Sequence, residues 1–275
     1  MGKRAGDGFF PLILKRDAPP ESKMESRTIG RLAGIRRYPV KSMAGEDVNA
    51  VYVHETGLNG DRVFAFYDHN SRRDELPYFT GREKKGLLLA KPEIINEPDR
   101  TQPYPEGYKP IVDVVLPNGK GIYEVSDPAI IAYITELCVP REVSVTVDYR
   151  RAGIQDSKPI SIMGLQTVDQ LARESGVSGL DPRRFRENFY VSWDNNQPFF
   201  EDSLVGRCLQ VGDELVIHVV KKNERCPMIC VDPDTAEYDK RVLGTVAREH
   251  GMNAGVYAMV RTPGAVRRND SIVLL

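Results

Sequence analysis

Cysteine is scarce in this sequence: 275 residues contain only four, and all of them lie between positions 138 and 230. Small secreted domains that rely on disulfides carry many more cysteines at short spacings. A chain of this length can also bury a core large enough to fold without covalent or metal crosslinks. The cysteine usage therefore favours a reducing compartment, and we expect the protein to be cytoplasmic.

Net charge and long apolar runs are lacking as well. Lys and Arg total 38 against 39 Asp and Glu, which leaves a formal net charge of -1. Nucleic-acid-binding proteins need a basic excess that neutralises phosphates, so we expect no nucleic-acid partner. The apolar stretch at residues 9–14 is too short for a signal peptide or a bilayer crossing, and we expect no membrane span.

Residues 1–27 are interpreted as a flexible tail. A mitochondrial targeting segment is the alternative, because basic residues such as Lys3, Arg4 and Lys15 occur in it. Targeting segments of this kind are poor in acidic residues, so Asp7 and Asp17 count against that alternative.

Familiar catalytic motifs are also missing. The sequence has no Gly-x-x-x-x-Gly-Lys phosphate loop, no Gly-x-Gly-x-x-Gly, no His-Glu-x-x-His and no Gly-x-Ser-x-Gly. Its histidines, at positions 54, 69, 218 and 250, lie too far apart to form a local metal-ligand pattern. Each histidine is interpreted as a surface or strand residue rather than a catalyst.

Short extended runs separated by turn residues dominate the sequence, which is typical of strands. Strands and long helices do not alternate regularly, which argues against a doubly wound parallel sheet. The predicted fold class is therefore α+β and rich in β structure. The expected strands are residues 30–40, 47–54, 62–67, 87–95, 111–116, 121–125, 142–149, 160–163, 185–193, 208–211, 214–220, 227–231, 255–261 and 271–275, and the expected helices are residues 128–138, 167–175 and 240–250.

Cap residues mark the ends of these helices. Asp127, followed by proline, is typical of a helix start. Thr167 and Gln170 have the spacing of a capping box at the start of the second helix. Gly176 and Gly251 are expected to end the second and third helices in the left-handed conformation.

Two domains are predicted, with a boundary in the polar connector between residues 149 and 159. The first, residues 28–150, includes a tight hairpin at Asn118-Gly119, a pair that readily takes the positive φ angles such a turn needs. The second, residues 151–275, is expected to be a barrel-like β structure with a few helices. Residues 211–216 and 268–273 both place a Gly/Asn-Asp turn before an apolar strand, which favours this packing.

The segment around Cys226 carries the first chemical signal. Arg225 directly before it would favour the thiolate, which is the form that acts as a nucleophile or soft-metal ligand. Pro227 is expected to keep Cys226 extended, on a short strand. The simpler alternative is a small buried core residue, as cysteines in strands more often are. A zinc site would need two more Cys or His residues at suitable spacing, and none is nearby.

Basic and polar residues at distant strand ends give a second signal. Taken singly, they are explained as solvated strand ends. Together they indicate a pocket for an anion, because Arg offers planar paired donors to phosphate and Lys a point charge. These residues are Lys41 and Ser42 after the first expected strand, Arg62 and Arg82 after turns, and Arg184, Arg186 and Asn188, which should share one face of a strand.

In this combination the sequence resembles the MOSC proteins, and among them the two-part, N-terminally extended group that includes the mitochondrial amidoxime-reducing component. The resemblance runs from about residue 29 to residue 275. Its most specific pieces are Tyr-Pro-Val-Lys-Ser at 38–42, Arg-Phe-Arg-x-Asn at 184–188 and Arg-Cys-x-x-x-x-Val-Asp-Pro-Asp-Thr at 225–235. It implies an N-terminal MOSC-associated β-rich domain over residues 28–150 and a MOSC domain over residues 151–275.

The resemblance also implies a molybdenum cofactor, molybdopterin with its metal, bonded by Cys226. The carried-over positions expected to hold the pterin and its phosphate are Lys41, Ser42, Arg62, Arg186 and Asn188, with Arg82 as a looser match and Arg225 beside the ligand. Asp234, or less so Asp232, is a candidate for proton delivery or for capping the turn, and the turn is favoured.

Three positions depart from the family pattern. Glu187 stands where relatives usually have proline, Glu224 where they can have serine, and Cys230 where threonine is common. A carboxylate at either of the first two would repel an anionic phosphate.

The function implied is reduction of N-hydroxylated small molecules: amidoximes, hydroxylamines and N-hydroxylated bases. The reaction depends on molybdenum and is independent of pyridoxal phosphate. The chain ends at residue 275 without an iron-sulfur domain, so the electrons are expected from a separate flavin- or haem-containing donor protein. One alternative is a cofactor carrier or sulfur-transfer protein that uses Cys226 as ligand or persulfide. A cofactor-free structural module is another.

Overall fold

The computed structural model describes residues 27–71, 77–117 and 119–275, so tail residues 1–26 and Asn118 lie outside the described residues. The α-helices in this part are α1 (Pro128–Glu136), α2 (Leu165–Ser175) and α3 (Arg241–His250). The 3-10 helices are η1 (Lys85–Leu89), η2 (Pro182–Phe185), η3 (Phe200–Leu204) and η4 (Pro227–Cys230). The strands are β1 (Arg27–Arg37), β2 (Glu46–Val48), β3 (Ala50–His54), β4 (Gly57–Leu58), β5 (Phe64–Asp68), β6 (Lys91–Ile94), β7 (Val112–Leu116), β8 (Gly121–Glu124), β9 (Val145–Tyr149), β10 (Ile160–Gly164), β11 (Phe189–Trp193), β12 (Cys208–Val211), β13 (Leu215–Glu224), β14 (Asn253–Thr262), β15 (Gly264–Arg267) and β16 (Ser271–Leu274). The β-rich fold class is confirmed.

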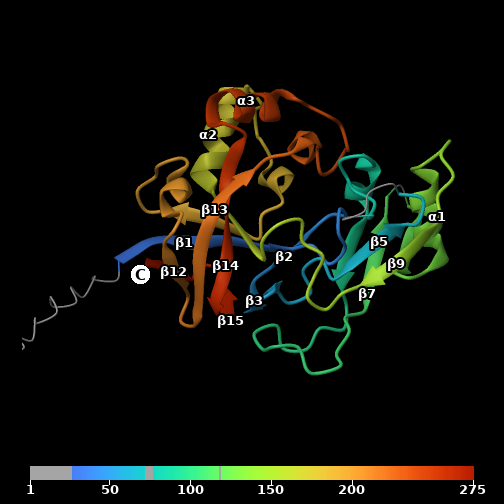
Figure 1. Cartoon of the computed structure of the whole chain (residues 1–275), viewed down its shortest axis with the longest axis horizontal. Helices are drawn as coiled ribbons and strands as arrows, with labels where there is room; N and C mark the ends of the chain where they lie inside the picture. The colour runs from blue at the N-terminus through green and yellow to red at the C-terminus, as the bar shows by residue number, and fades with distance from the viewer. Residues whose placement is uncertain (1–26, 72–76, 118) are drawn as a thin grey trace, which may run out of the picture.

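A closed barrel forms the centre of the molecule (Figure 1). The main sheet has the order β11-β10-β14-β13-β12-β16-β1-β2, and β11 also pairs with β1, so seven strands form a ring with β2 attached to β1. Closure leaves no free edge on these seven strands. The interior is filled by alternate residues of the strands, such as Leu32, Ile35 and Ile217, which are fully buried.

A second core lies beside the barrel, under α1. The strand pair β5–β9 and the sheet β6-β7-β8 cover it, and α1 contributes Ile130 and Ile134, which are both fully buried. In the sheet, Leu116 of β7 lies opposite Gly121 of β8 in antiparallel pairing, so the predicted pairing of these two strands is confirmed, while the turn predicted at Asn118 lies outside the described residues. These elements lie to the right of the barrel in Figure 1.

The strand ladders cross the predicted domain boundary near residue 150. β1 and β2 come from before it, yet they belong to the same sheet as β11 and β16. The boundary therefore remains a prediction, and any two domains share this sheet. Within the described residues, no helix is long and apolar enough to cross a membrane.

Helix starts and stops follow the expected caps at most ends. Asp127 accepts a hydrogen bond from the backbone N–H of Ala129 at 2.8 Å, and Gly176 and Gly251 take the left-handed conformation. The predicted capping box at Thr167 is wrong. α2 begins earlier, at Leu165, and the Thr167 hydroxyl points inward and donates to Glu201 Oε1 at 2.8 Å.

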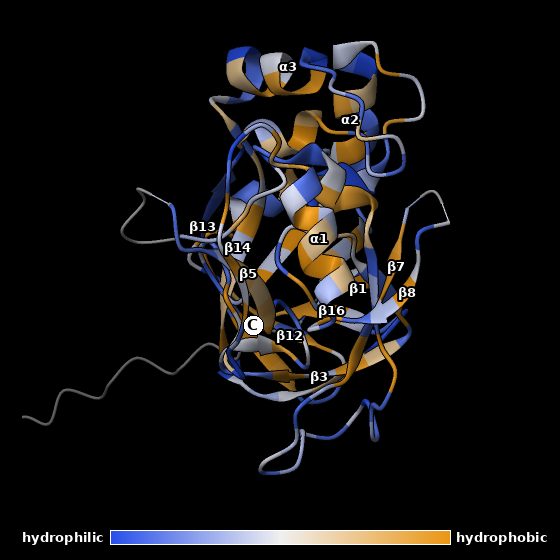
Figure 2. Cartoon of the chain, turned by 90° about the vertical axis from the view of Figure 1, so that its right-hand side faces the viewer, coloured by the Kyte–Doolittle hydropathy of each residue, from blue (hydrophilic) through white to orange (hydrophobic). Residues whose placement is uncertain are grey.

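α2 and α3 lie side by side at one end of the barrel (Figures 1 and 2). Both helices mix apolar and hydrophilic residues along their length in Figure 2. Leu171 of α2 and Val242 and Val246 of α3 are fully buried in the cluster between the helices and the barrel. This packing covers one end of the barrel.

Three expected strands are partly or wholly 3-10 helix. Residues 182–185 form η2 because Asp181 caps the turn and Pro182 starts it. Residues 227–230 form η4, which again begins with a proline at a position whose missing N–H costs nothing. The expected strand at 87–95 splits into η1 and the shorter β6.

Gly164 should be intolerant of a side chain. A Cβ there would lie 2.6 Å from Trp193 Nε1 and 2.9 Å from Glu201 Oε2. We expect Gly164→Ala to lower the free energy of unfolding by about 1–3 kcal/mol, because the overpacked core must shift. The control is Gly244→Ala in α3, where the new Cβ meets nothing within 4 Å and should stabilise by about 0.5–1 kcal/mol. Urea unfolding of both variants measures the difference; equal effects would contradict this packing.

Candidate functional site

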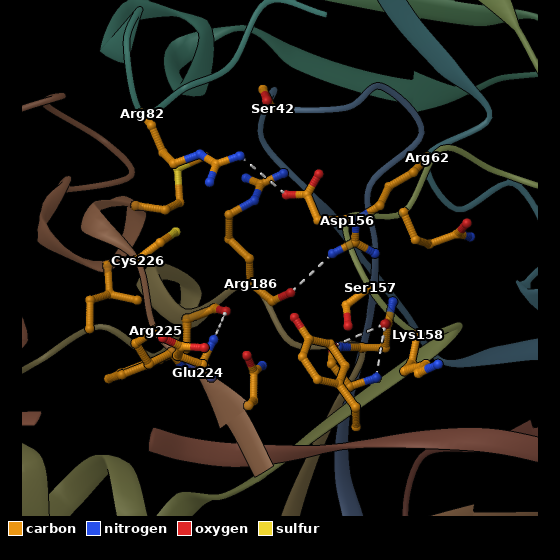
Figure 3. Close-up of a pocket in the computed structure, with 18 of the residues that line it drawn as sticks. Ser42, Arg62, Arg82, Asp156, Ser157, Lys158, Arg186, Glu224, Arg225 and Cys226 are labelled. Atoms are coloured by element: carbon orange, nitrogen blue, oxygen red, sulfur yellow. Dashed lines mark hydrogen bonds and ion pairs between the residues drawn. The ribbon is translucent and has the colours of Figure 1, made fainter. Parts of the chain in front are cut away.

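A cavity of about 110 Å³ brings together residues from both halves of the chain (Figure 3). It lies where the loops after β1, β4 and β9 meet the ends of β13 and η2. Nine of the ten residues predicted to form the site line it, namely Lys41, Ser42, Arg62, Arg82, Arg184, Arg186, Asn188, Arg225 and Cys226.

Cys226 lies between the end of β13 and the start of η4 rather than on a strand. Its backbone is extended, with φ of -119° and ψ of 173°, and Pro227 begins the 3-10 turn directly after it. The residue is partly exposed and its thiol is not in a disulfide. It can therefore reach a ligand in the cavity. Within the described part of the chain, no three His, Cys, Asp or Glu side chains form a cluster that could hold a metal ion.

Arg225 does not direct its guanidinium toward the neighbouring thiol. The side chain points into the protein, where Nε donates to the Ala254 carbonyl at 2.8 Å and Nη1 to the Phe185 carbonyl at 3.0 Å. Nη2 pairs with the fully buried carboxylate of Glu187. Arg225 thus fixes the backbone that carries Cys226, and its charge is already neutralised.

Because Glu187 pairs with Arg225, it does not repel an anion in the cavity as its charge alone would predict. Its carboxylate does not line the cavity, and Oε1 also accepts from Asn223 Nδ2 at 3.1 Å. The paired charge stays out of contact with an anion in the cavity. Glu224, in contrast, is exposed at the cavity wall, so the second departure does place a carboxylate at the site.

Lys41 extends into the cavity from the loop after β1. Its Nζ donates to the Ile154 carbonyl at 2.8 Å and to the Asp156 carboxylate. Burial lowers the pKa of this lysine, while the charge of Asp156 opposes the shift. The ammonium therefore depends on an anion beside it.

Arg62 and Arg186 both stack on the ring of Tyr38. The guanidinium carbons lie 4.5 and 4.2 Å from the ring centroid, and Arg62 Nη2 also donates to the Arg186 carbonyl at 3.2 Å. Both residues have positive φ, 53° and 57°, and both line the cavity. Arg62 is neutralised by Asp61.

Arg186 has no carboxylate partner among the described residues. Burial lowers its pKa to about 10, so it remains a cation at neutral pH. A partly buried cation without a counter-charge is costly and attracts an anion. Arg186 is therefore a cation of the cavity whose charge is available to a bound anion.

Arg184 and Asn188 do not share a strand face with Arg186, so that expectation is wrong. Arg184 lies in η2 and also lines the cavity, and its guanidinium donates to the Cys230 carbonyl at 3.1 Å and to Asp232 at 2.8 Å. Asn188 is 2% exposed and bonds Ser161 and the Arg36 carbonyl at 3.1 and 3.2 Å. It lines the cavity but mainly holds strands together.

Asp234 is the predicted residue that lies away from the cavity lining. Its Oδ1 accepts from Arg183 Nη1 at 3.0 Å on the outside of the turn. The turn itself is capped by Asp232, whose Oδ1 accepts from the N–H groups of Asp234 and Thr235 at 3.0 Å each. The structure thus gives the turn role to Asp232 and gives no support for proton delivery by Asp234.

Asp234→Asn should therefore leave the reduction of N-hydroxylated compounds, the activity that the sequence resemblance implies, nearly intact. We expect turnover of such a substrate within about twofold of wild type. Loss of the exposed ion pair to Arg183 should cost at most about 1 kcal/mol of stability. Steady-state kinetics check the first expectation, and a tenfold or larger loss of activity in folded protein would contradict this placement.

The connector between β9 and β10 also contributes to the cavity, which its sequence did not predict. Asp156, Ser157 and Lys158 line the cavity, and so does Tyr257 of β14. The connector showed only a polar composition, which was interpreted as a domain boundary. No local motif separates such a segment from an ordinary linker.

Comparison with known proteins gives a match for the second half of the chain. Residues 149–273 match the family model of the MOSC domain. The YUAD protein from Bacillus subtilis has a solved structure that is 14% identical, with a TM-score of 0.49 over 91% of this chain and 97% of that one. YiiM from Escherichia coli is 17% identical, and YiiM from Geobacillus stearothermophilus 14%, with TM-scores of 0.32 and 0.31; each alignment covers 42% of this chain and 54% of the other. No curated protein matches the sequence.

Proposed function

We propose that the protein binds the molybdenum cofactor beside Cys226 and reduces N-hydroxylated compounds. The proposal is supported by the match of residues 149–273 to the MOSC domain, a type of domain associated with this cofactor. The substrates in this proposal are amidoximes, hydroxylamines or N-hydroxylated bases, as the resemblance in the sequence implies.

One observation carries the cofactor part of the proposal: a partly exposed thiol and an unpaired cation line the same cavity. The thiolate of Cys226 is a ligand suited to soft metals. Arg186, with no carboxylate partner in the described chain, attracts an anion such as a phosphate. A ligand that combines a metal centre with a phosphate group satisfies both.

The donor set fits the molybdenum cofactor. Cys226 Sγ would bond the metal, and Lys41, Arg62, Arg82 and Arg186 would donate to the phosphate and the pterin. The cofactor supplies a centre that exchanges two electrons with the substrate. The chain's own contribution is to hold the thiol in place through the Arg225–Glu187 pair and to surround the anion with donors.

The proposed reaction takes up two electrons and two protons. The N–O bond of the amidoxime breaks, its oxygen leaves as water, and the amidine remains. A separate flavin- or haem-containing protein supplies the electrons in this proposal. The partner can be replaced by a chemical reductant in a test.

Protein loaded with the molybdenum cofactor should convert an aromatic amidoxime to the amidine when a chemical reductant is present. Chromatographic measurement of the amidine tests this, with cofactor-free protein as the control. Absence of turnover, together with transfer of the cofactor to a cofactor-free molybdenum enzyme, would contradict the reductase function and favour the carrier function.

A further inference from the structure

Asp156 places a carboxylate in a cavity whose other walls are mainly basic. Its Oδ1 accepts a hydrogen bond from Lys41 Nζ, and its Oδ2 lies 3.8 Å from Arg82 Nη2. Figure 3 shows this carboxylate between Arg82 and Arg62, close to the Arg186 side chain. Asp156 thus occupies the position that a bound anion would take beside these cations.

The charges around Asp156 keep it ionised. Burial alone would raise the pKa of Asp156, but the charges of Lys41, Arg82 and Arg62 outweigh burial and hold the pKa below its ordinary value. The lysine side chain is 5% exposed and needs a counter-charge, which the carboxylate provides. A phosphate bound to the same cations would be repelled by this carboxylate.

Residues 156–158 form the tip of the connector between β9 and β10, and this tip is held mainly by side chains. The connector is anchored before it, since Ile154 N–H donates to the Arg62 carbonyl at 2.8 Å and Gln155 Nε2 to the Thr56 carbonyl at 3.1 Å. Residues 156–158 make no backbone–backbone hydrogen bond within the described chain. The Asp156 side chain is 54% exposed, whereas the Lys41 ammonium is buried and needs an anionic partner. Residues 156–158 can therefore be displaced when a bound anion replaces the carboxylate.

A larger cavity lies on the other side of this tip. It measures about 590 Å³, and Gln155 and Ser157 line both cavities. Pockets that bind organic ligands typically measure roughly 300–1,000 Å³, which exceeds the 110 Å³ of the site around Cys226. Movement of the tip into the larger cavity would enlarge the site and remove the carboxylate from the cations.

We propose that Asp156 is an internal competitor for the anion position: it pairs with Lys41 and Arg82 until a phosphate-bearing ligand displaces it. The carboxylate thereby sets the affinity of the cavity for phosphate groups. The inference rests on the proposed function only in requiring that the cavity takes a phosphate-bearing ligand.

Calorimetric titration of cofactor-free, full-length protein with inorganic phosphate tests this proposal. Asp156→Asn should bind phosphate roughly three- to tenfold more tightly than wild type, because the competing charge is gone. The matched control is Glu136→Gln on α1, outside the cavity. It removes a 65% exposed carboxylate that pairs with Lys120. The control should bind phosphate as wild type does.

A second measurement covers the case in which Asp156→Asn is less stable. Phosphate should raise its melting temperature more than that of wild type, because ligand stabilisation follows affinity. Equal or weaker binding by Asp156→Asn, or no binding by any of the proteins, would overturn the proposal. Tighter binding by a protein that never retains molybdenum would uphold it and overturn the proposed function instead.

Discussion

Replacing Cys226 with serine should lower the turnover of an aromatic amidoxime by more than about 100-fold, because residues that only support a metal ligand already cost 10- to 100-fold when removed. The side chain is partly exposed and lies between β13 and η4, so the fold does not depend on it. Stability should change by less than about 1 kcal/mol. Single-turnover kinetics with reductant-treated, cofactor-loaded protein measure the loss.

The matched control for this variant is Cys208→Ser. Cys208 is also a partly buried free cysteine, but it lies on β12, away from the cavity lining. Its replacement should leave turnover unchanged. If Cys226→Ser retained more than about a tenth of wild-type turnover, the thiol would not be the metal ligand.

Replacing Arg186 with methionine should weaken phosphate binding and at the same time stabilise the cofactor-free protein. The cofactor-free protein should become about 1–2 kcal/mol more stable, because a cation whose pKa burial lowers to about 10 is removed. Part of that gain is offset by loss of the stacking contact with Tyr38. Affinity for inorganic phosphate should fall about 10- to 100-fold, as expected for loss of a charged hydrogen-bond donor. Thermal unfolding and calorimetry measure the two effects.

Arg183→Met is the control for Arg186→Met. Arg183 lies three residues earlier, but it pairs with Asp181 and Asp234 outside the cavity around Cys226. Its replacement should lower stability slightly and leave phosphate affinity unchanged. A loss of stability in Arg186→Met as large as in Arg183→Met would mean that Arg186 is a paired structural residue.

Regular strands and capped helices are the parts of the fold that the sequence predicts well. The expected strand at 208–211 coincides with β12, and the helix expected at 240–250 is α3 with its terminal Gly251. In both, local pattern and final packing agree. The turns η2 and η4 were not predicted, because a proline that begins a 3-10 turn gives the same signal as one that precedes a strand, and long-range bonds such as Arg184 to the Cys230 carbonyl decide between them.

The sequence predicts which residues belong to the site better than it predicts where their side chains point. Lys41, Arg62 and Arg186 could be grouped by residue type, since cations at strand ends tend to face a common ligand. The direction of Arg225 could not be predicted, because it depends on Glu187, 38 residues earlier in the chain. Asp156 was missed for the same reason: its partners lie 115 and 74 positions away and no local pattern marks them.

Metal analysis tests most directly whether Cys226 bonds a molybdenum cofactor in this cavity, as we propose. Wild-type protein expressed in a host that makes the cofactor should retain molybdenum at about one atom per chain after purification. Cys226→Ser should retain a small fraction of this, and Cys208→Ser should match wild type. Equal molybdenum in Cys226→Ser and wild type, or none in either, would contradict the claim.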